Sequence, residues 1–395
     1  MNRIKLFLRK NIDTVGVALF MLFIFSYIMF VVGQKSDLLW HAKIANNRCV
    51  EHHMFSDNFL MYFLTNVLSC FYTGKMFPTK CALAFLIAMS NTAKYVLVKN
   101  EFSKTYSSRT AKMASLALLF VFVIPVFYFF NVSFSILPNS MYLGYYVPNV
   151  WHNSTVLCMM PFAIITFFLS LRQLDNYDRR RNLLIALFVV LGALVKPSFF
   201  FVYMVAFPIC MFARYRFGKE FLHSLLPIFL GILCLLYEYL TIYDGKDGNS
   251  VAISILPLFT LEFWNPRIWY FMVSLALPVL FVLFYWKEIR QDREFWFILI
   301  MLVIALGISW CCQETGNRAT HGNFAWQVIS TMWFVYYYML KIWMSKNKLL
   351  FCVRENRGML EKGALIDKIF IVLYCVHVLM GVCYLARFLV TKNYV

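Results

Sequence analysis

Residues 33–62 read GQKSDLLWHAKIANNRCVEHHMFSDNFLMY and form one of the few long polar stretches in a chain that is 62% apolar. They follow the first long apolar run of the chain. Asp37 and His41 are four residues apart, so in a helix both side chains lie on one face. A carboxylate beside an imidazole can transfer protons at the surface of a membrane protein. A solvated loop lying on the bilayer is the alternative interpretation of the same residues.

The composition excludes an ordinary soluble protein. Only 14% of the 395 residues are charged, whereas soluble domains average about 25%. Repeated apolar runs are long enough to cross the roughly 30 Å of hydrocarbon in a bilayer, which predicts an all-α polytopic membrane protein. The net charge of +18 is then expected in cytoplasmic loops rather than on a nucleic-acid-binding surface. Most of the eleven cysteines lie in apolar runs, where they behave as small apolar residues.

The apolar runs predict about eleven transmembrane helices, preceded by a basic N-terminal segment that acts as a retained signal anchor. The expected helices cover residues 14–33, 81–98, 113–131, 155–171, 182–195, 198–213, 221–242, 268–286, 295–311, 324–340 and 366–390. No internal repeat or low-complexity linker divides them, so we expect one integral membrane domain over residues 1–395.

Residues 58–72 are apolar but too few for a typical bilayer-spanning helix. If they form a surface helix, the predicted cytoplasmic loops hold 24 Lys and Arg residues and the predicted outer segments hold 9. If they span the membrane, 20 of those 24 residues move outside, against the rule that basic residues stay in the cytoplasm. We therefore expect a first outer loop of about residues 34–80 that carries one or two surface helices. The N-terminus is then inside and the C-terminus outside.

This topology collects titratable side chains on the outer side of the membrane, as an active site there requires. The histidines expected on that side are His41, His52, His53, His152 and His321. A simpler cause is that few basic residues lie outside, which leaves acids and histidines as the main titratable groups of the outer loops.

A second candidate feature is the turn within LGALVKPSFFF, residues 191–201. Pro197 ends the preceding helix, which places Lys196 at the outer turn of a helical hairpin. An isolated lysine at such a depth is costly unless it reaches the interface or meets an anion. The functional interpretation is a clamp for a lipid phosphate, and the alternative is a lysine that extends to the membrane surface.

Two outer loops add further candidates. SILPNSMYLGYYVPNVWHNST, residues 135–155, places Tyr145 and His152 among turn-forming residues; aromatic side chains there suit sugar rings, although interfacial aromatic belts have the same sequence pattern. CCQETGNRATHGNFAW, residues 311–326, contains Arg318 as its sole basic residue. Arg318 can bind a phosphate through two hydrogen bonds, and a salt bridge to Glu314 is the alternative.

A metal site is the weaker interpretation of the first outer loop. Its candidate ligands are His41, His52, His53 and Asp57. No HxxxH or HExxH pattern supports a tight site. The sequence therefore assigns no cofactor, and a divalent metal is the alternative.

The order of these features resembles the polytopic GT-C glycosyltransferases, and most closely their protein O-mannosyltransferase and aminoarabinose-transferase branch. In DLLWHAKIANN and EHHMFSDNFLMYFL, Asp37 takes the acidic position that follows the family's first span, and His53 stands near its turn. LGALVKPSFFF resembles the family's glycine-to-lysine hairpin, with Lys196 as the matching lysine. PNVWHNSTVLCMMPFAIITFFLSLR resembles the segment that runs into the fourth span. The likeness covers about residues 1–215, and residues 216–395 correspond to the variable spans.

The resemblance implies a GT-C-like bundle that moves a sugar, with inversion, from a polyprenyl-phosphate or polyprenyl-diphosphate carrier. The acceptor is then a glycan, lipid or protein at the outer face. Asp37 is the implied general base, and Lys196 with Arg318 is implied to hold the donor phosphate. The other substrate-binding candidates are His41, His53, Tyr145, His152, Glu314 and His321.

Two rival functions use similar lipid-linked substrates. A flippase or transporter needs polar residues within the spans, which offer little beyond Lys94 and Glu238. An O-antigen polymerase or ligase carries a large Arg-rich outer loop, whereas the matching loop here has only Arg318. The expected location is a bacterial plasma membrane. Asn131-Val-Ser and Asn153-Ser-Thr match the N-glycosylation sequence, which leaves an endoplasmic reticulum membrane as the alternative.

Overall fold

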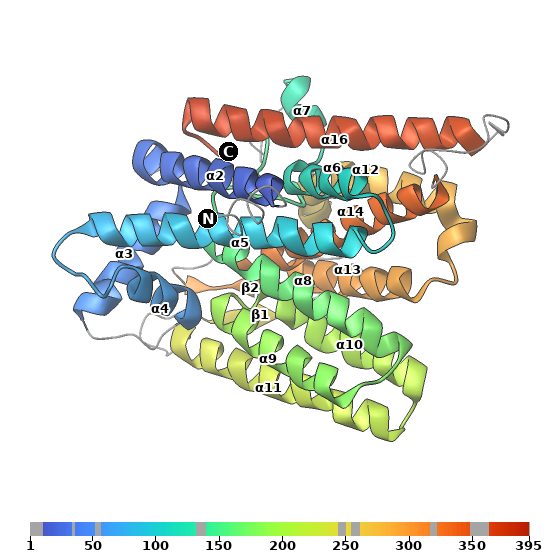
Figure 1. The fold of residues 1–395 in the computed structure, drawn as a ribbon, viewed down its shortest axis with the longest axis horizontal. Coiled ribbons are helices and arrows are strands. Elements are labelled where there is room, and N and C mark those ends of the chain that lie inside the picture. The colour runs from blue at the N-terminus through green and yellow to red at the C-terminus, as the bar shows by residue number, and fades with distance from the viewer. Residues whose placement is uncertain are drawn as a thin grey trace, which may run out of the picture. The chain divides into compact units, whose positions relative to one another are not determined.

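The computed structural model describes residues 11–33, 36–51, 57–131, 140–243, 250–253, 261–316, 322–347 and 363–394. Most of these residues are helical (Figure 1). By length and composition, eight of the described helices can cross a membrane, which confirms a helical polytopic membrane protein. The eight are Ile12–Val32, Met76–Phe102, Ser154–Asp175, Ser198–Tyr215, Lys219–Ile242, Ile268–Ile289, Arg293–Cys311 and Leu365–Thr391.

The other three predicted spans correspond to helices that are shorter or less apolar, so the count of eleven stays a prediction. α9 (Arg179–Val195) has 17 residues. α14 (Trp326–Lys346) has 21 residues, but it buries the polar side chains of Gln327, Ser330 and Thr331 among its aromatic ones.

The third of these segments, residues 113–131, is interrupted rather than one continuous helix. α6 (Ser108–Phe120) is followed by five non-helical residues. The side-chain amide of Asn149 donates hydrogen bonds to the carbonyl oxygens of Leu118 (3.1 Å) and Val121 (2.8 Å). These bonds satisfy carbonyl groups that the end of a helix leaves unpaired, so a buried interruption is tolerated.

Two compact units form by packing, and each is described by itself. The first contains Met1–Glu101, Val150–Lys246 and Phe388–Tyr394, and the second contains Phe102–Asn149 and Asp247–Arg387. The first unit extends beyond residue 215, because α11 packs on α9 and α10. Its described helices are α2 (Ile12–Tyr27), η1 (Ile28–Val32), α3 (Asp37–Val50), α4 (Phe59–Leu68), α5 (Met76–Phe102), α8 (Ser154–Asp175), α9, α10 (Ser198–Tyr215) and α11 (Lys219–Ile242).

In the first unit, α8, α9, α10 and α11 lie side by side and alternate in direction (Figure 1). Their turns have clear local causes. Asn153 caps α8 by accepting a hydrogen bond from the Val156 backbone N–H at 3.0 Å, and such caps satisfy a free helix N–H. α9 ends at Val195 and α10 begins at Ser198, so the predicted hairpin turn at Lys196 is confirmed.

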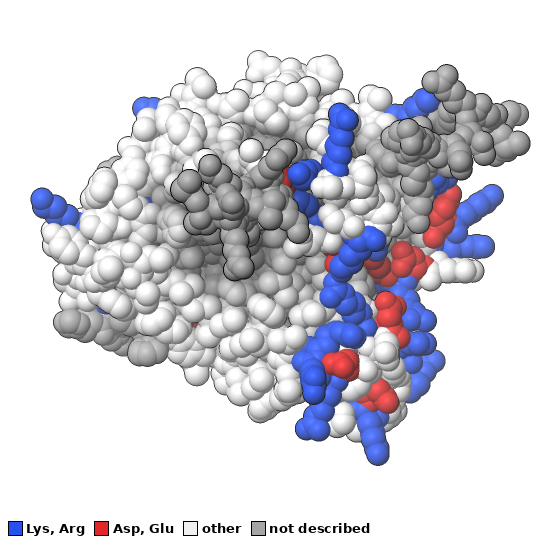
Figure 2. Space-filling model, viewed as in Figure 1, with Lys and Arg blue, Asp and Glu red and all other residues white. Residues whose placement is uncertain are grey.

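Charge separates the two ends of this four-helix group. The end where α8 and α10 finish and α9 and α11 begin is covered by Lys and Arg side chains (Figure 2). The exposed basic residues there are Arg172, Arg179, Arg180, Arg214, Arg216 and Lys219. The opposite end carries the start of α8, the Lys196 turn and the last turns of α11. The Lys196 turn therefore lies at the end of the group opposite these basic residues.

Residues 34–80, which the sequence predicts to form an outer loop with one or two surface helices, contain the two short helices α3 and α4. α3 contacts α4 and α8, and α4 contacts α9. α4 has 10 residues, about half the length that a transmembrane helix needs. Its buried side chains include Tyr62 and Thr65.

The second unit is built around α14, most of whose side chains are buried. α14 contacts α6, α12 (Leu261–Ile289) and α13 (Arg293–Cys311). The unit also contains α7 (Val126–Phe129), η5 (Asn323–Ala325) and most of α16 (Gly363–Thr391). β1 (Val251–Ile253) and β2 (Cys312–Glu314) pair antiparallel, with Val251 opposite Glu314.

Gly192 lets α9 approach the start of α10, and this contact sets the position of the Lys196 turn. A Cβ atom built at Gly192 falls 2.1 Å from Cζ of Phe200 and 3.0 Å from Cβ of Phe162. The Phe200 ring is fully buried, so the ring has little room to move. A methyl group at this position must therefore push the hairpin apart.

We expect Gly192→Ala to lower the free energy of unfolding by about 1–3 kcal/mol, the usual cost of overpacking. Thermal unfolding in detergent measures the change. Gly16→Ala is the matched control, because no atom lies within 4 Å of a Cβ built there, and alanine normally stabilises a helix by about 0.5–1 kcal/mol relative to glycine. A Tm for Gly192→Ala at or above that of Gly16→Ala would contradict the close approach.

Candidate functional site

Asp37 is the first residue of α3 and is half-buried. A carboxylate at this position is favoured by the positive end of the helix dipole. Its Oδ2 accepts a hydrogen bond from the side-chain amide of Asn153 at 3.3 Å. Asn153 is 5% exposed, so the amide holds the start of α3 against the start of α8.

A chain of hydrogen bonds continues from Asn153 to Lys196. Thr155 Oγ1 donates to Asn153 Oδ1 at 2.9 Å, and Lys196 Nζ donates to Thr155 Oγ1 at 3.0 Å. The threonine hydroxyl thus donates one bond and accepts another, as its chemistry allows. Asp37 and Lys196, which the sequence places on different segments, are joined in one site through two neutral side chains.

His41 lies one helical turn beyond Asp37 on α3. Its Nδ1 atom is 2.5 Å from the hydroxyl oxygen of Tyr62 on α4. Burial, and then the positive charges of Lys196 and Arg48, lower the pKa of His41 to about 3. The imidazole is therefore neutral at physiological pH, and Lys196 lies close enough to act on it electrostatically.

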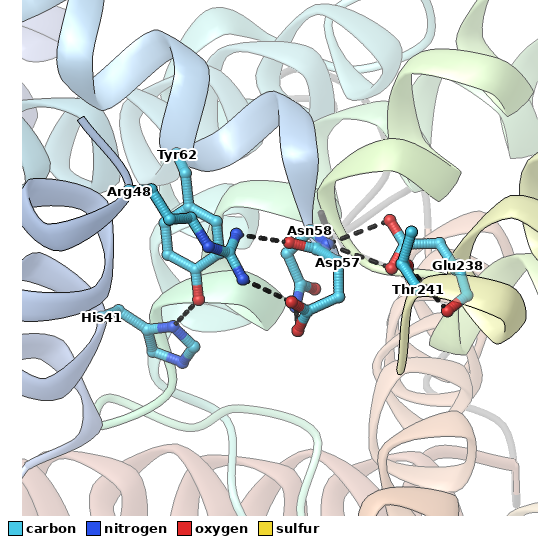
Figure 3. Close-up of polar contacts among 7 residues, drawn as sticks. All are labelled: His41, Arg48, Asp57, Asn58, Tyr62, Glu238 and Thr241. Carbon is cyan, nitrogen blue, oxygen red and sulfur yellow. Dashed lines mark hydrogen bonds and ion pairs between the residues drawn. The ribbon is translucent and has the colours of Figure 1, made fainter. Parts of the chain in front are cut away.

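A second polar network extends from His41 toward α11 (Figure 3). The Arg48 guanidinium donates to the Asp57 carbonyl oxygen at 2.7 Å and to the Asp57 carboxylate. The same guanidinium lies over the Tyr62 ring, with Cζ 4.1 Å from the ring centroid, which is a favourable cation–π geometry. On the far side of Asp57, the backbone N–H of Asn58 donates to both carboxylate oxygens of Glu238.

His152 borders the site from the segment that leads into α8. It is 2% exposed, and its ring stacks on Tyr394 with centroids 4.1 Å apart and an interplanar angle of 12°. Burial lowers the pKa of His152 to about 3. Burial and then the negative charge of Asp37 raise the pKa of Tyr394, which places this phenol near the carboxylate.

The charges of the site therefore reside on few groups. Neither His41 nor His152 is positively charged at neutral pH, so positive charge comes from Lys196 and Arg48. Asp37 is the half-buried carboxylate on the same helix face as His41. A carboxylate and a lysine held in one site can accept a proton from one substrate group and stabilise negative charge on another.

Two other predicted site residues belong to the second unit. Tyr145 is 2% exposed, and its ring packs edge-on against Tyr270 at 4.4 Å between centroids. Glu314 is 4% exposed and accepts a hydrogen bond from the Asn323 amide at 2.6 Å. The remaining predicted residues, His53, Arg318 and His321, lie outside the described residues, so their roles stay predictions.

The metal interpretation gains no support from the described part of the chain. No group of three or more His, Cys, Asp or Glu side chains with metal-binding geometry occurs among residues 11–33, 36–51, 57–131, 140–243, 250–253, 261–316, 322–347 and 363–394. Asp57, one of the suggested ligands, is instead paired with Arg48. The neighbouring His52 and His53 lie outside these ranges.

Asn153 corrects one interpretation of the sequence. Asn153-Ser-Thr matches a glycosylation sequence, but the side chain is 5% exposed. Its Oδ1 caps α8 and its Nδ2 donates to Asp37. A glycan on that nitrogen has no room in the folded protein, so the same three residues serve as a helix cap and as the bridge to Asp37.

Sequence reasoning also missed the residues that connect the site. Tyr62, Thr155 and Arg48 were not singled out, and Glu238 was considered only as a polar residue within a span. For Thr155 a signal exists, because Asn-x-Thr before an apolar run is a pattern for a helix start. For Tyr62, Arg48 and Tyr394 the sequence offers no signal, since their partners lie on other helices.

Comparison of the chain with protein-family models, with curated proteins and with solved structures finds no match.

The buried His152 makes a pH dependence testable. Its folded-state pKa of about 3 lies below the value of about 6.5 in an unfolded chain. The unfolded state therefore binds more protons between these values, and the contribution to stability is full above pH 6.5 and is lost as the pH falls toward 3. The loss amounts to about 1.4 kcal/mol per pH unit below pH 6.5.

We expect the Tm of the wild-type protein in detergent to fall between pH 7 and pH 5, and His152→Gln to reduce this fall. His223→Gln is the control for the loss of a histidine, because His223 is exposed at the basic end of the four-helix group. Equal pH dependence for wild type and His152→Gln would refute the assignment of a neutral buried imidazole.

Proposed function

We propose that this protein is an inverting glycosyltransferase of the GT-C type. It moves a sugar from a polyprenyl-phosphate or polyprenyl-diphosphate lipid to a glycan, lipid or protein acceptor. The observation that supports the proposal most is the hydrogen-bonded chain from Asp37 through Asn153 and Thr155 to Lys196. The chain brings together the carboxylate and the lysine that the family resemblance implies for base and phosphate.

The proposed reaction uses Asp37 as general base. The carboxylate takes the proton of the acceptor hydroxyl while the acceptor oxygen forms a bond to the anomeric carbon of the sugar. The bond from that carbon to the phosphate oxygen breaks, and the electron pair stays on the phosphate. Attack from the face opposite the leaving phosphate inverts the anomeric centre. Lys196 stabilises the negative charge that develops on the leaving group.

In this scheme the histidine side chains act in their uncharged form. His41 and His152 have pKa values lowered to about 3, so they hold hydroxyl groups of donor or acceptor by hydrogen bonds rather than by charge. Arg318 is proposed as a second phosphate contact. His53, Tyr145, Glu314 and His321 are proposed as further substrate contacts.

The membrane orientation follows from the charge of the first unit. Basic residues gather in the cytoplasm, so the end of the four-helix group that carries Arg179 and Arg216 is proposed to face inward. The Asp37–Lys196 site lies at the other end of the same helices and is proposed to face outward. We propose a bacterial plasma membrane as the location, and the occupied side chain of Asn153 removes one of the two sequence features that favoured the endoplasmic reticulum.

Asp37→Asn tests the base. The amide keeps the shape of the side chain but cannot take a proton, so we expect transfer to fall by about 10²–10⁴-fold, the usual contribution of a general base. The assay follows release of polyprenyl phosphate in proteoliposomes supplied with polyprenyl-phosphate hexoses and pentoses. Glu101→Gln is the control, because this carboxylate forms an ion pair with Arg172 at the basic end of the first unit. Wild-type turnover by Asp37→Asn would eliminate the proposed base.

Variants of Lys196 test the role of its positive charge, and the same assay separates sugar transfer from lipid transport. We expect Lys196→Met to lower kcat strongly by removing the charge that stabilises the leaving phosphate, and Lys196→Arg to retain more activity than Lys196→Met because the charge is kept. The same proteoliposomes report movement of the labelled lipid across the bilayer. Lipid movement without sugar transfer in the wild type would favour the rival flippase, and equal loss in both lysine variants would argue against a role for the charge.

A further inference from the structure

Glu238 is a carboxylate buried within a candidate transmembrane helix. It is 2% exposed and lies near the end of α11, most of whose other side chains are apolar. A carboxylate removed from water costs several kcal/mol unless its oxygens find donors or positive charge. The proposed reaction does not use Glu238, so its placement needs another explanation.

The partner of Glu238 is the beginning of α4. Both carboxylate oxygens accept the backbone N–H of Asn58 at 3.0 Å, and Asn58 directly precedes α4 with a left-handed φ of 52°. The start of a helix carries partial positive charge and unpaired N–H groups. Glu238 thus supplies, from a distant helix, the cap that α4 does not obtain from its own side chains, since Asn58 forms no side-chain cap bond.

The residue before Asn58 is held from the opposite direction. Arg48 on α3 binds both the carbonyl oxygen and the carboxylate of Asp57. The pair Asp57–Asn58 is therefore fixed between α3 and α11, as Figure 3 shows. A ten-residue helix is too short to be stable alone, so the position of α4 depends on such contacts.

The first turn of α4 connects Asn58 to the site. Tyr62 stands one turn after Asn58, and its hydroxyl group lies 2.5 Å from Nδ1 of His41. Arg48 also covers the Tyr62 ring. If the start of α4 shifts, Tyr62 moves with it and the His41 ring loses the partner that sets its orientation.

We infer that Glu238 is a positioning residue that fixes His41 relative to Asp37 and Lys196, acting through Asn58 and Tyr62. The placement of His41 stands on the contacts alone, whereas the effect of Glu238 on sugar transfer rests on the proposed function. The two parts therefore receive separate measurements.

The first measurement is NMR of the full-length protein in detergent, with ¹³C-labelled histidine. The chain has only seven histidines, and His41→Gln identifies the His41 signal. In the wild type we expect no titration of His41 between pH 5 and pH 8. In Glu238→Ala, the His41 signal should shift and titrate within this range, because the ring becomes more accessible to water. Tyr62→Phe removes only the hydroxyl group and should shift the same signal.

Glu238→Gln keeps one oxygen for Asn58 and should shift the His41 signal in the same direction by a smaller amount. It replaces Glu238→Ala in the test if the alanine variant does not fold. Leu240→Ala is the matched control on α11, because Leu240 is 59% exposed. A His41 signal that responds to Tyr62→Phe but stays at its wild-type position and titration in the folded Glu238 variants would overturn the inference.

The second measurement is sugar transfer in proteoliposomes. A displacement of about 1 Å in a catalytic group can cost about 10²-fold in rate, so we expect Glu238→Gln to lower kcat by roughly 10-fold or more with little change in KM for the lipid donor. A shifted His41 signal with wild-type kcat would overturn the role of Glu238 in transfer. Absence of transfer in the wild type itself would overturn the proposed function and leave the NMR result to decide the placement of His41.

Discussion

The requirement that buried polar atoms be hydrogen-bonded organises the site of this protein. Asn153 illustrates it, because its single amide group serves three partners. Its oxygen accepts from the Val156 backbone and from Thr155, and its nitrogen donates to Asp37. An unsatisfied buried donor or acceptor costs about 1–3 kcal/mol. The start of α8, the start of α3 and the Lys196 turn are therefore fixed together by a side chain that takes no part in the proposed chemistry.

Burial also decides which groups of the site carry charge. The pKa values of His41 and His152 fall to about 3, so the imidazoles remain neutral where water is excluded. Arg48 is paired with Asp57. The site thus presents a carboxylate, a lysine and neutral hydrogen-bonding rings, which are groups that can accept a proton and stabilise negative charge.

Contacts at the beginning of α4 hold the site in place from outside it. Glu238 on α11 holds the beginning of α4, and Arg48 on α3 holds the residue before it. Each contact pairs a side chain with backbone groups at a loop or helix start, where the backbone has free donors and acceptors. The polar groups near the site are in this way connected across α3, α4 and α11.

The sequence by itself determined the helical, membrane-spanning class, because apolar runs of bilayer length can satisfy their backbone groups only as helices. It also predicted the hairpin turn at Lys196, where Pro197 stops a helix, and one or two short helices within residues 34–80. The interruption after α6 was missed, because the Asn149 side chain that stabilises it comes from a different segment. For the same reason, only the resemblance to the GT-C glycosyltransferases suggested from the sequence that Asp37 and Lys196 belong to one site.

Only the tertiary structure decided which side chains meet. The sequence gives no sign that Tyr62 faces His41, that Glu238 caps α4, or that Asn153 is occupied by Asp37 rather than open to a glycan. Local patterns report the preferences of neighbouring residues, whereas these contacts join segments far apart in the chain. Their formation depends on the packing of α3, α4, α8, α9 and α11 against one another.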